Sequence, residues 1–204
     1  SGAGAVNVTG GAVNGAGAYS VSGTTAAAGG TANFNSASGT TASGSLSSGT
    51  WGGSGHISVT GAMSWTGGTI AGAGSTDIAA GAALNISGST DKTFNSGTVN
   101  NAGTATWTGT GRIMGYYGGT FNNLSGGLFD AQNDSSFYNS YGGAPHFNNN
   151  AGATFRKSAG SGTTTMSGPF NNSGTVDARS GTVSFTNTYV QAAGATLLNG
   201  GAIA

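Results

Sequence analysis

The chain has 204 residues, of which 42 are glycine and only 5% are charged. Globular proteins usually carry about 25% charged residues and about 7% glycine. Because the charges sum to zero, the sequence offers neither a basic surface for nucleic acid nor a charged surface for a membrane. The absence of cysteine excludes a disulfide scaffold and cysteine-based zinc binding, and irregularly spaced glycine with only two prolines excludes collagen.

A repeat of about 22 residues runs along the chain. It is clearest where Phe121, Phe147 and Phe170 are each followed by two asparagines and, a few residues later, by a glycine. The same register extends to further large apolar residues, here called anchors, at Val13, Phe34, Ile57, Ile78, Val99 and Val190. Self-similarity at a fixed period is typical of folds built from stacked repeats.

Each repeat contains short stretches in which large apolar and small polar residues alternate, a pattern typical of half-buried strands. In chain order, such stretches include residues 18–21, 62–65, 82–86 and 104–107. Glycines that follow the anchors predict turns, because glycine adopts positive φ without steric cost. We expect this role for Gly17, Gly61, Gly103, Gly174 and Gly194. A second glycine turn often follows, so three short strands are predicted in each repeat.

No repeat can bury its apolar side chains alone, whereas stacked repeats pair strand on strand, about 4.8 Å apart. The sequence therefore predicts an all-β fold, a right-handed parallel β-helix or β-solenoid, with about nine coils of about 22 residues. No change of composition marks a linker, so residues 1–204 are expected to form one domain. The first 50 residues fit the register least closely. The longest interval, 121–147, predicts a coil with a bulged turn.

Six asparagines occupy the position after an anchor and would form a column in stacked coils. They are Asn14, Asn35, Asn100, Asn122, Asn148 and Asn171. An asparagine amide can donate to the residue on one side and accept from the residue on the other. We therefore expect a structural ladder at this position and not a ligand site.

Candidate catalytic groups are few. Asp130 and Asp134 are the only close acidic pair, and four residues of extended strand place them about 13 Å apart, too far for the usual glycosidase pair. We expect a solvated turn there, and surface positions for His56, His146 and the basic pair 156–157. Since no ligand spacing for a metal occurs, we expect no metal site, no cofactor and no enzymatic activity.

Aromatic side chains are the remaining candidates for contact with a ligand. The three tryptophans, Trp51, Trp65 and Trp107, could stack on sugar rings, but two of them end alternating runs and are expected in the core. Better candidates for an exposed aromatic patch lie near predicted turns, and these are Tyr116, Tyr117, Tyr138 and Tyr141.

Two runs of the sequence resemble the β-strand repeats of very large secreted bacterial surface proteins, such as adhesins, autotransporter passengers and filamentous-haemagglutinin-like chains. They are Phe170-Asn-Asn-Ser-Gly-Thr-Val-Asp-Ala-Arg-Ser-Gly-Thr-Val-Ser-Phe185 and Val59-Thr-Gly-Ala-Met-Ser-Trp-Thr-Gly-Gly-Thr69. The similarity covers most of the chain and is clearest over residues 45–200. It implies a parallel β-helix, export to the cell surface and a structural or adhesive role. It implies no catalytic residues.

The main functional hypothesis is therefore a structural module of an extracellular fibre or adhesin. Its partners would be other copies stacked head to tail, neighbouring repeats of a longer chain, a surface glycan or a host receptor; neither nucleic acid nor a membrane span is expected. Neither end of the sequence reads as a capping repeat, which fits coil stacking. One alternative is an ice-binding solenoid, which would need Thr-x-Thr on every coil. The other alternative is a carbohydrate-binding or carbohydrate-processing β-helix.

Overall fold

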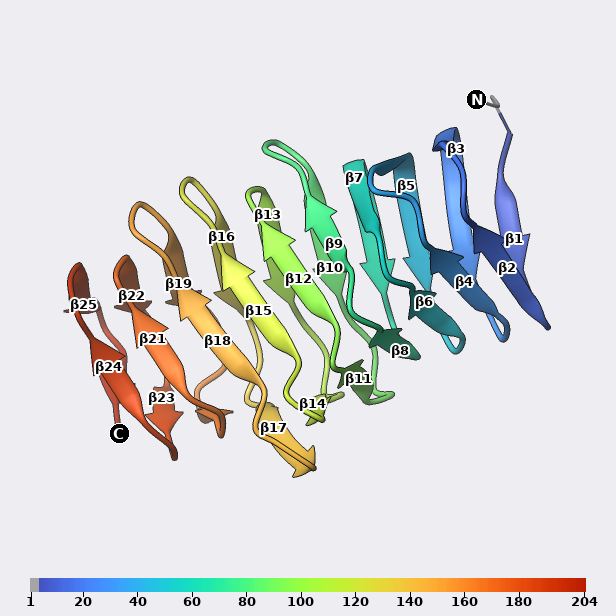
Figure 1. Cartoon of the computed structure of the whole chain (residues 1–204). Helices are drawn as coiled ribbons and strands as arrows, with labels where there is room; N and C mark the ends of the chain where they lie inside the picture. Colours follow the sequence, from blue (N-terminus) through green and yellow to red (C-terminus); the bar gives the residue numbers. More distant parts are fainter. Residues whose placement is uncertain (1–3) are drawn as a thin grey trace.

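The computed structural model describes residues 4–204, which form 26 strands and no helix. The expected start of the domain at residues 1–3 lies outside the described residues. The strands follow one another in a spiral that advances from the N-terminal to the C-terminal coil (Figure 1).

The first eight strands have the following bounds: β1 (Val6–Val8), β2 (Ala12–Gly15), β3 (Tyr19–Ala27), β4 (Thr31–Phe34), β5 (Gly39–Leu46), β6 (Thr50–Gly52), β7 (His56–Trp65) and β8 (Thr69–Ala71). The middle of the chain forms β9 (Ser75–Ile78), β10 (Ala83–Ile86), β11 (Lys92–Asn95), β12 (Thr98–Asn101), β13 (Thr104–Trp107), β14 (Ile113–Tyr116), β15 (Thr120–Asn123), β16 (Leu128–Ala131) and β17 (Ser136–Tyr141). The last strands are β18 (His146–Asn149), β19 (Thr154–Lys157), β20 (Thr163–Met166), β21 (Phe170–Asn172), β22 (Thr175–Ala178), β23 (Thr182–Phe185), β24 (Tyr189–Gln191), β25 (Ala195–Leu198) and β26 (Ala202–Ile203).

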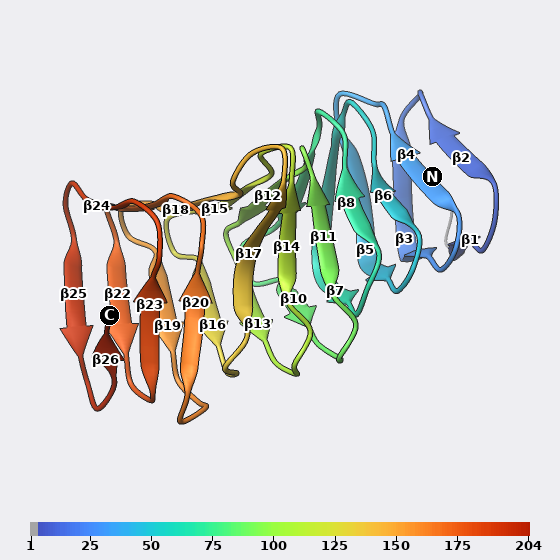
Figure 2. The same cartoon turned by 90° about the horizontal axis from the view of Figure 1, so that it is seen from below.

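Two parallel sheets run the length of the stack. The first sheet has sixteen strands and the second has ten. Figure 2 shows strands of the second sheet side by side, from β2 at one end to β26 at the other. Because each coil contributes to both sheets, backbone hydrogen bonds join every coil to its neighbours in the stack.

The first sheet divides after β7. Up to this point each coil supplies one long strand, and β3, β5 and β7 pair with a register shift that bends them. Beyond it, β9 and β10 both pair with β7 and continue as two separate arms that end at β24 and β25. The early coils therefore have two strands, and only the coils from β9 onward have the predicted three.

The spacing of the coils follows from the strand register. A column of paired residues runs from Tyr19 to Tyr189 in eight steps of 18 to 26 residues, about 21 on average. The longest step joins Phe121 to Phe147, where the bulged coil was expected. The chain is thus a β-solenoid of about nine coils, which confirms the predicted fold class.

Four of the expected anchors lie outside this column. Val13 and Phe34 belong to β2 and β4 of the second sheet, because the short early coils lack the corner that separates the first two strands later in the chain. Ile78 lies two residues beyond the column, and Val190 is the outward-facing neighbour of Tyr189. The assignment of these four residues as equivalent to Phe121 is therefore wrong.

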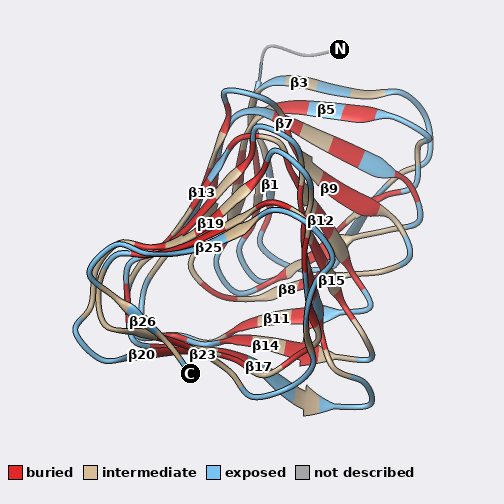
Figure 3. Ribbon diagram, turned by 90° about the vertical axis from the view of Figure 1, so that its left-hand side faces the viewer, coloured by how far each residue is buried: buried red, intermediate tan, exposed pale blue. Residues whose placement is uncertain are grey.

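Aromatic stacking fills the C-terminal half of the core. Phe147 lies nearly parallel to Phe121 and Phe170, with ring centroids 5.1 Å and 4.9 Å away. Phe129 and Phe155 form a second stacked column, and its rings meet those of the first column edge to face. Both arrangements are favourable for aromatic rings, and all five side chains are buried. Figure 3, a view along the stack, shows buried positions alternating with less buried ones along the strands.

The five predicted turn glycines have different roles. Only Gly194 has positive φ, at 75°. At Gly103 and Gly174, a Cβ would collide with carbonyl oxygens of the preceding coil, so close backbone approach and not a left-handed turn requires glycine. Gly17 lies in a bend with open space around it. Gly61 lies inside β7, so its assignment to a turn is wrong.

Candidate functional site

The outward face of the β12–β21 arm carries a ladder of amide side chains. Asn100 donates to the Asp77 carboxylate at 2.7 Å and so begins the ladder. Asn122, Asn148 and Asn171 then each donate to the amide oxygen of the preceding coil at 2.8 to 2.9 Å. We refer to these five residues as the outer ladder. The structure thus brings together four of the six expected asparagines in one ladder. The ladder begins at the Asp77 carboxylate, which sequence reasoning missed.

The other two asparagines do not belong to this ladder. Asn14 lies in β2 of the second sheet, where its amide oxygen accepts from Asn33 at 2.7 Å. Asn35 follows β4, and its side chain accepts from the backbone and hydroxyl of Ser54. Their placement in the ladder is therefore wrong, for the same reason as the misplaced anchors Val13 and Phe34.

A second ladder lies inside the molecule. Asn101, Asn123 and Asn149 each donate to the amide oxygen of the following coil at 2.8 to 3.0 Å, and the series ends at Asn172. Each of the three also donates to a backbone carbonyl at the next corner, at 2.9 to 3.0 Å. We call this set the inner ladder; all four side chains are buried. In the sequence, the inner ladder corresponds to the second asparagine of each Asn-Asn pair.

The acidic pair Asp130 and Asp134 is divided between two cations of the following coil. Arg156 contacts the Asp130 carboxylate at 2.6 Å, and Lys157 contacts the Asp134 carboxylate at 2.8 Å. Burial alone would raise the pKa of Asp130, but hydrogen bonds from Arg156 and Gln132 outweigh it and hold the pKa below its ordinary value. The hydrogen bond from Lys157 likewise lowers the pKa of Asp134. Both carboxylates thus hold neighbouring coils together.

The lowered pKa of Asp130 makes stability depend on pH. A carboxyl whose pKa is lower in the folded state contributes stability above its unfolded value, near 3.9, and loses it as pH falls through the folded pKa. We expect the urea midpoint to fall progressively on acidification below about pH 4.5. Asp130→Asn should flatten part of this decline. An equally steep acid decline in Asp130→Asn would contradict the assignment of the effect to Asp130.

Lysine side chains occupy the interior, contrary to the expected surface location of residues 156–157. Arg156 is half-buried, but Lys157 is completely buried, and so is Lys92. The Lys157 ammonium donates to the Asn133 and Ala159 carbonyls at 2.6 and 3.0 Å, in addition to Asp134. The partners of this buried cation are thus backbone carbonyls at a corner, outside the paired strands. Sequence reasoning did not identify the burial of Lys157.

The two histidines lie at the surface and Trp65 and Trp107 lie in the core, as expected. His56 and His146 are exposed, and the His56 ring contacts the Ser75 hydroxyl at 2.6 Å. The three tryptophans are fully buried and fill the core.

The bulged coil presents tyrosines to solvent. Tyr117, Tyr138 and Tyr141 are 56%, 40% and 63% exposed, while the fourth candidate, Tyr116, is half-buried. The rings of Tyr117 and Tyr141 meet edge to face, with centroids 5.6 Å apart. We refer to the three exposed residues as the tyrosine surface. The end of β17 and the loop after it, which carry Tyr141, project beyond the neighbouring coils (Figure 1).

A polar groove adjoins this surface. Its volume is about 560 Å³, and it lies between the β13–β14 and β16–β17 corners, lined by Thr110, Arg112, Gln132, Asp134 and Ser136 among others. The Arg112 guanidinium lies over the Tyr138 ring at 5.4 Å and thus joins the groove to the tyrosine surface. The same guanidinium donates two hydrogen bonds to the Asp91 carboxylate, and these bonds lower the pKa of Asp91.

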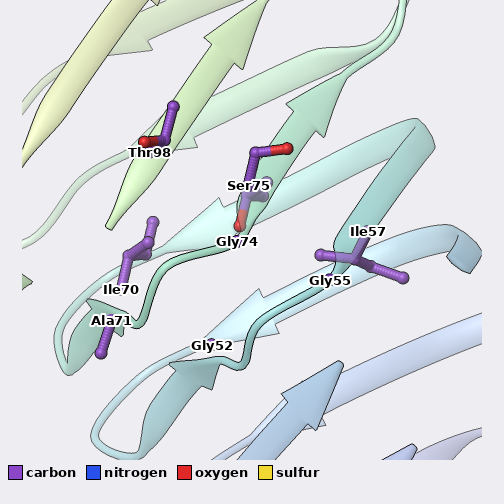
Figure 4. A pocket seen from close by; sticks show the side chains of 9 residues that line it. Gly52, Gly55, Ile57, Ile70, Ala71, Gly74, Ser75 and Thr98 are labelled. Atoms are coloured by element: carbon purple, nitrogen blue, oxygen red, sulfur yellow. The ribbon is translucent and has the colours of Figure 1, made fainter. Parts of the chain in front are cut away.

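The pocket drawn in Figure 4 is far smaller than this groove. That pocket lies beside β6, β8 and β9, and its volume is about 10 Å³. A volume of this size holds about one water molecule. Its lining of Gly52, Gly55, Gly74 and the hydroxyl-bearing Ser75 and Thr98 fits water and no larger ligand.

The chain matches no protein-family model, no curated protein and no solved structure. Among residues 4–204, no helix is long and apolar enough to cross a membrane. The same residues contain no group of three or more His, Cys, Asp or Glu side chains that could hold a metal ion.

Proposed function

We propose that this chain is a structural, non-enzymatic segment of an extracellular fibre or surface adhesin, and that it extends the fibre by stacking coil on coil. The observation that carries the proposal is the pair of hydrogen-bonded sheets that continue from the first described coil to the last. Solenoids of this kind grow by adding coils, since each coil contacts only its neighbours. The extracellular location is proposed from the resemblance to secreted bacterial surface repeats.

The bonding of the acidic groups supports a structural role. Asp130 and Asp134 are each bound by a cation of the next coil, and Asp177 accepts from Arg179 at 2.6 Å. Asp77 belongs to the outer ladder. Each of these carboxylates is engaged by a cation or an amide within or between coils, whereas hydrolysis of a glycoside needs a pair of carboxyl groups that are available to the substrate.

Both end coils expose strand edges and apolar side chains. Within residues 4–204, the strands β24, β25 and β26 pair only with the preceding coil, and β1 and β2 pair only with the following one. One column of inward-facing side chains begins at Val8 in the first coil and ends at Leu198 in the last coil. The side chain of Leu198 is 62% exposed. A further coil, from a longer chain or from a second copy, would cover Leu198 and pair these edges.

The expected result for self-stacking is growth of filaments by the isolated chain. Leu198→Asp should prevent it, because a charge would be buried where the next coil packs. Leu197→Asp is the matched control, since Leu197 lies on the same strand, is 41% exposed and faces outward with Asp177. Sedimentation and electron microscopy of the three proteins measure the effect. A parent chain that stays monomeric at high concentration would reject self-stacking and leave covalent extension.

Ice binding is the weaker alternative. Thr31, Thr50, Thr69 and Thr93 stack on the second sheet, and all four are half-buried. The next column on the same face holds asparagine, glycine and alanine instead of a second rank of threonine. This face therefore has one column of threonines and not the two that a Thr-x-Thr array requires.

A further inference from the structure

We propose that the tyrosine surface and the adjoining groove form a binding site for a neutral oligosaccharide. The site is independent of the proposed fibre function, because it lies on the outer side of the stack and not at an end coil.

Tyr117 occupies a position where glycine would fit better. Five consecutive coils turn at the same corner with positive φ, and the corner residues are Gly53, Gly72, Ser96, Tyr117 and Gly142. For Tyr117 the φ is 53°, in the left-handed region that a side chain with a Cβ disfavours. Glycine occupies three of the five corners. A tyrosine at this unfavourable corner, with more than half of its side chain exposed, indicates that its ring is used for contact.

The extra residues of the bulged coil place a second ring against the first. Tyr141 accepts a backbone hydrogen bond from Tyr117 at 2.9 Å, and the next residue, Gly142, passes so close to the Tyr117 ring that a Cβ there would clash. Pro145 closes the loop by packing over Gly115, where a Cβ would also clash. These contacts pack the loop against β14 and place the rings of Tyr117 and Tyr141 edge to face.

Tyr138 lies on the same outward face. In the register of β14 and β17, Tyr138 pairs with Met114 and Tyr141 pairs with Tyr116, and a bulge between the two pairs accounts for the odd spacing. Met114 and Tyr116 point to one side of their strand, so the two β17 tyrosines do as well. Three residues of strand separate them by roughly 10 Å, which leaves room for more than one sugar ring.

The chemistry of the site fits a neutral sugar. Tyrosine faces stack on the apolar faces of sugar rings, and the hydroxyl, amide and guanidinium groups of the groove can bond sugar hydroxyls. The charges at the groove are paired, Arg112 with Asp91 and Asp134 with Lys157. An acidic sugar would therefore find no free cation. The other exposed large apolar side chains, Val13, Val190, Leu197 and Leu198, lie in the end coils, so the site lacks the apolar core of a protein interface.

The test is calorimetric titration of the full chain with five hexasaccharides. Cellohexaose, hexa-N-acetylchitohexaose, maltohexaose and mannohexaose are neutral, and hexagalacturonate is the acidic comparison. We expect at least one neutral sugar to bind and hexagalacturonate not to bind. Tyr141→Ala and Tyr138→Ala should each weaken binding by roughly five- to tenfold. Val13→Ala, which removes an exposed apolar side chain of the same sheet far from the groove, should leave binding unchanged.

Tyr117→Gly separates contact from folding. Because glycine suits the left-handed corner, this variant should unfold at the same urea concentration as the parent or at a higher one, yet bind the sugar at least fivefold more weakly. Absence of binding to all four neutral sugars overturns the proposal, as does preference for hexagalacturonate. Undiminished binding by Tyr117→Gly and Tyr141→Ala also overturns it.

Discussion

Replacing Lys157 with methionine is expected to lower the free energy of unfolding by about 3 kcal/mol, whereas the same change at Lys92 is expected to raise it by about 1 kcal/mol. Both side chains are completely buried, and each lies at the corner between the first and second sheets. The opposite signs follow from what surrounds the two ammonium groups.

The Lys157 ammonium is fully bonded. It donates to the Asn133 and Ala159 carbonyls and the Thr164 hydroxyl, and it forms the ion pair with Asp134. Methionine fills a similar volume but offers no donor. The Ala159 carbonyl then loses its bond from Lys157, the buried Asn133 carbonyl keeps only the Thr164 hydroxyl, and Asp134 loses its cation. Each buried group left without a partner costs about 1 to 3 kcal/mol.

The Lys92 ammonium has a single long hydrogen bond, to the Gly88 carbonyl at 3.3 Å. Burial lowers the pKa of Lys92, which means that the charged form is disfavoured in the folded chain. Methionine removes a buried charge with little loss of bonding, and such replacements by apolar residues of similar size are often stabilising.

Urea unfolding at pH 7 and pH 10 measures both effects. Between the lowered folded pKa of Lys92 and its ordinary value near 10.4, the unfolded chain binds more protons, so stability should rise with pH across this window. The gain from Lys92→Met should therefore be larger at pH 7 than at pH 10. Lys157→Met should lose stability at both values. Equal losses in the two variants would contradict the distinction between a satisfied and an unsatisfied buried lysine.

The periodicity of apolar residues and glycines was sufficient to predict the solenoid. Stacked coils repeat their backbone path, so the same residue types recur at the same positions, and Phe121, Phe147 and Phe170 fall in one column as predicted. The early coils were misaligned because their first two strands are continuous and lack a corner. An apolar residue followed by asparagine there, as at Val13 and Phe34, lies in the other sheet.

The buried lysines could not be predicted, because their burial depends on carbonyls that converge at a corner only when coils are stacked. Charged residues are otherwise nearly always at the surface. The aromatic candidates were predictable in kind, since proximity to turns identified Tyr117, Tyr138 and Tyr141 as exposed. The left-handed corner at Tyr117 was not predictable, because it is recognised only when the equivalent residues of five coils are compared.

Neighbouring asparagines in β18 provide the second large effect. Asn149→Ala is expected to lower the free energy of unfolding by about 3 kcal/mol, and Asn148→Ala by about 0.5 kcal/mol. Asn149 donates to Asn172 and to the Thr175 carbonyl and accepts from Asn123, all at 2.8 to 3.0 Å within the buried inner ladder. Its removal leaves groups of two adjacent coils without partners and out of reach of water.

Asn148 makes equally short bonds in the outer ladder, to Asn122 and from Asn171 at 2.8 and 2.9 Å, but its side chain is only half-buried. Water replaces those bonds after Asn148→Ala, so little stability is lost. The two variants delete the same atoms from adjacent positions of one strand, and each is therefore the control for the other. Urea unfolding at pH 7 compares them. Equal losses would mean that bond number and not burial sets the contribution of a ladder, and that water competes as poorly at the outer ladder as at the inner one.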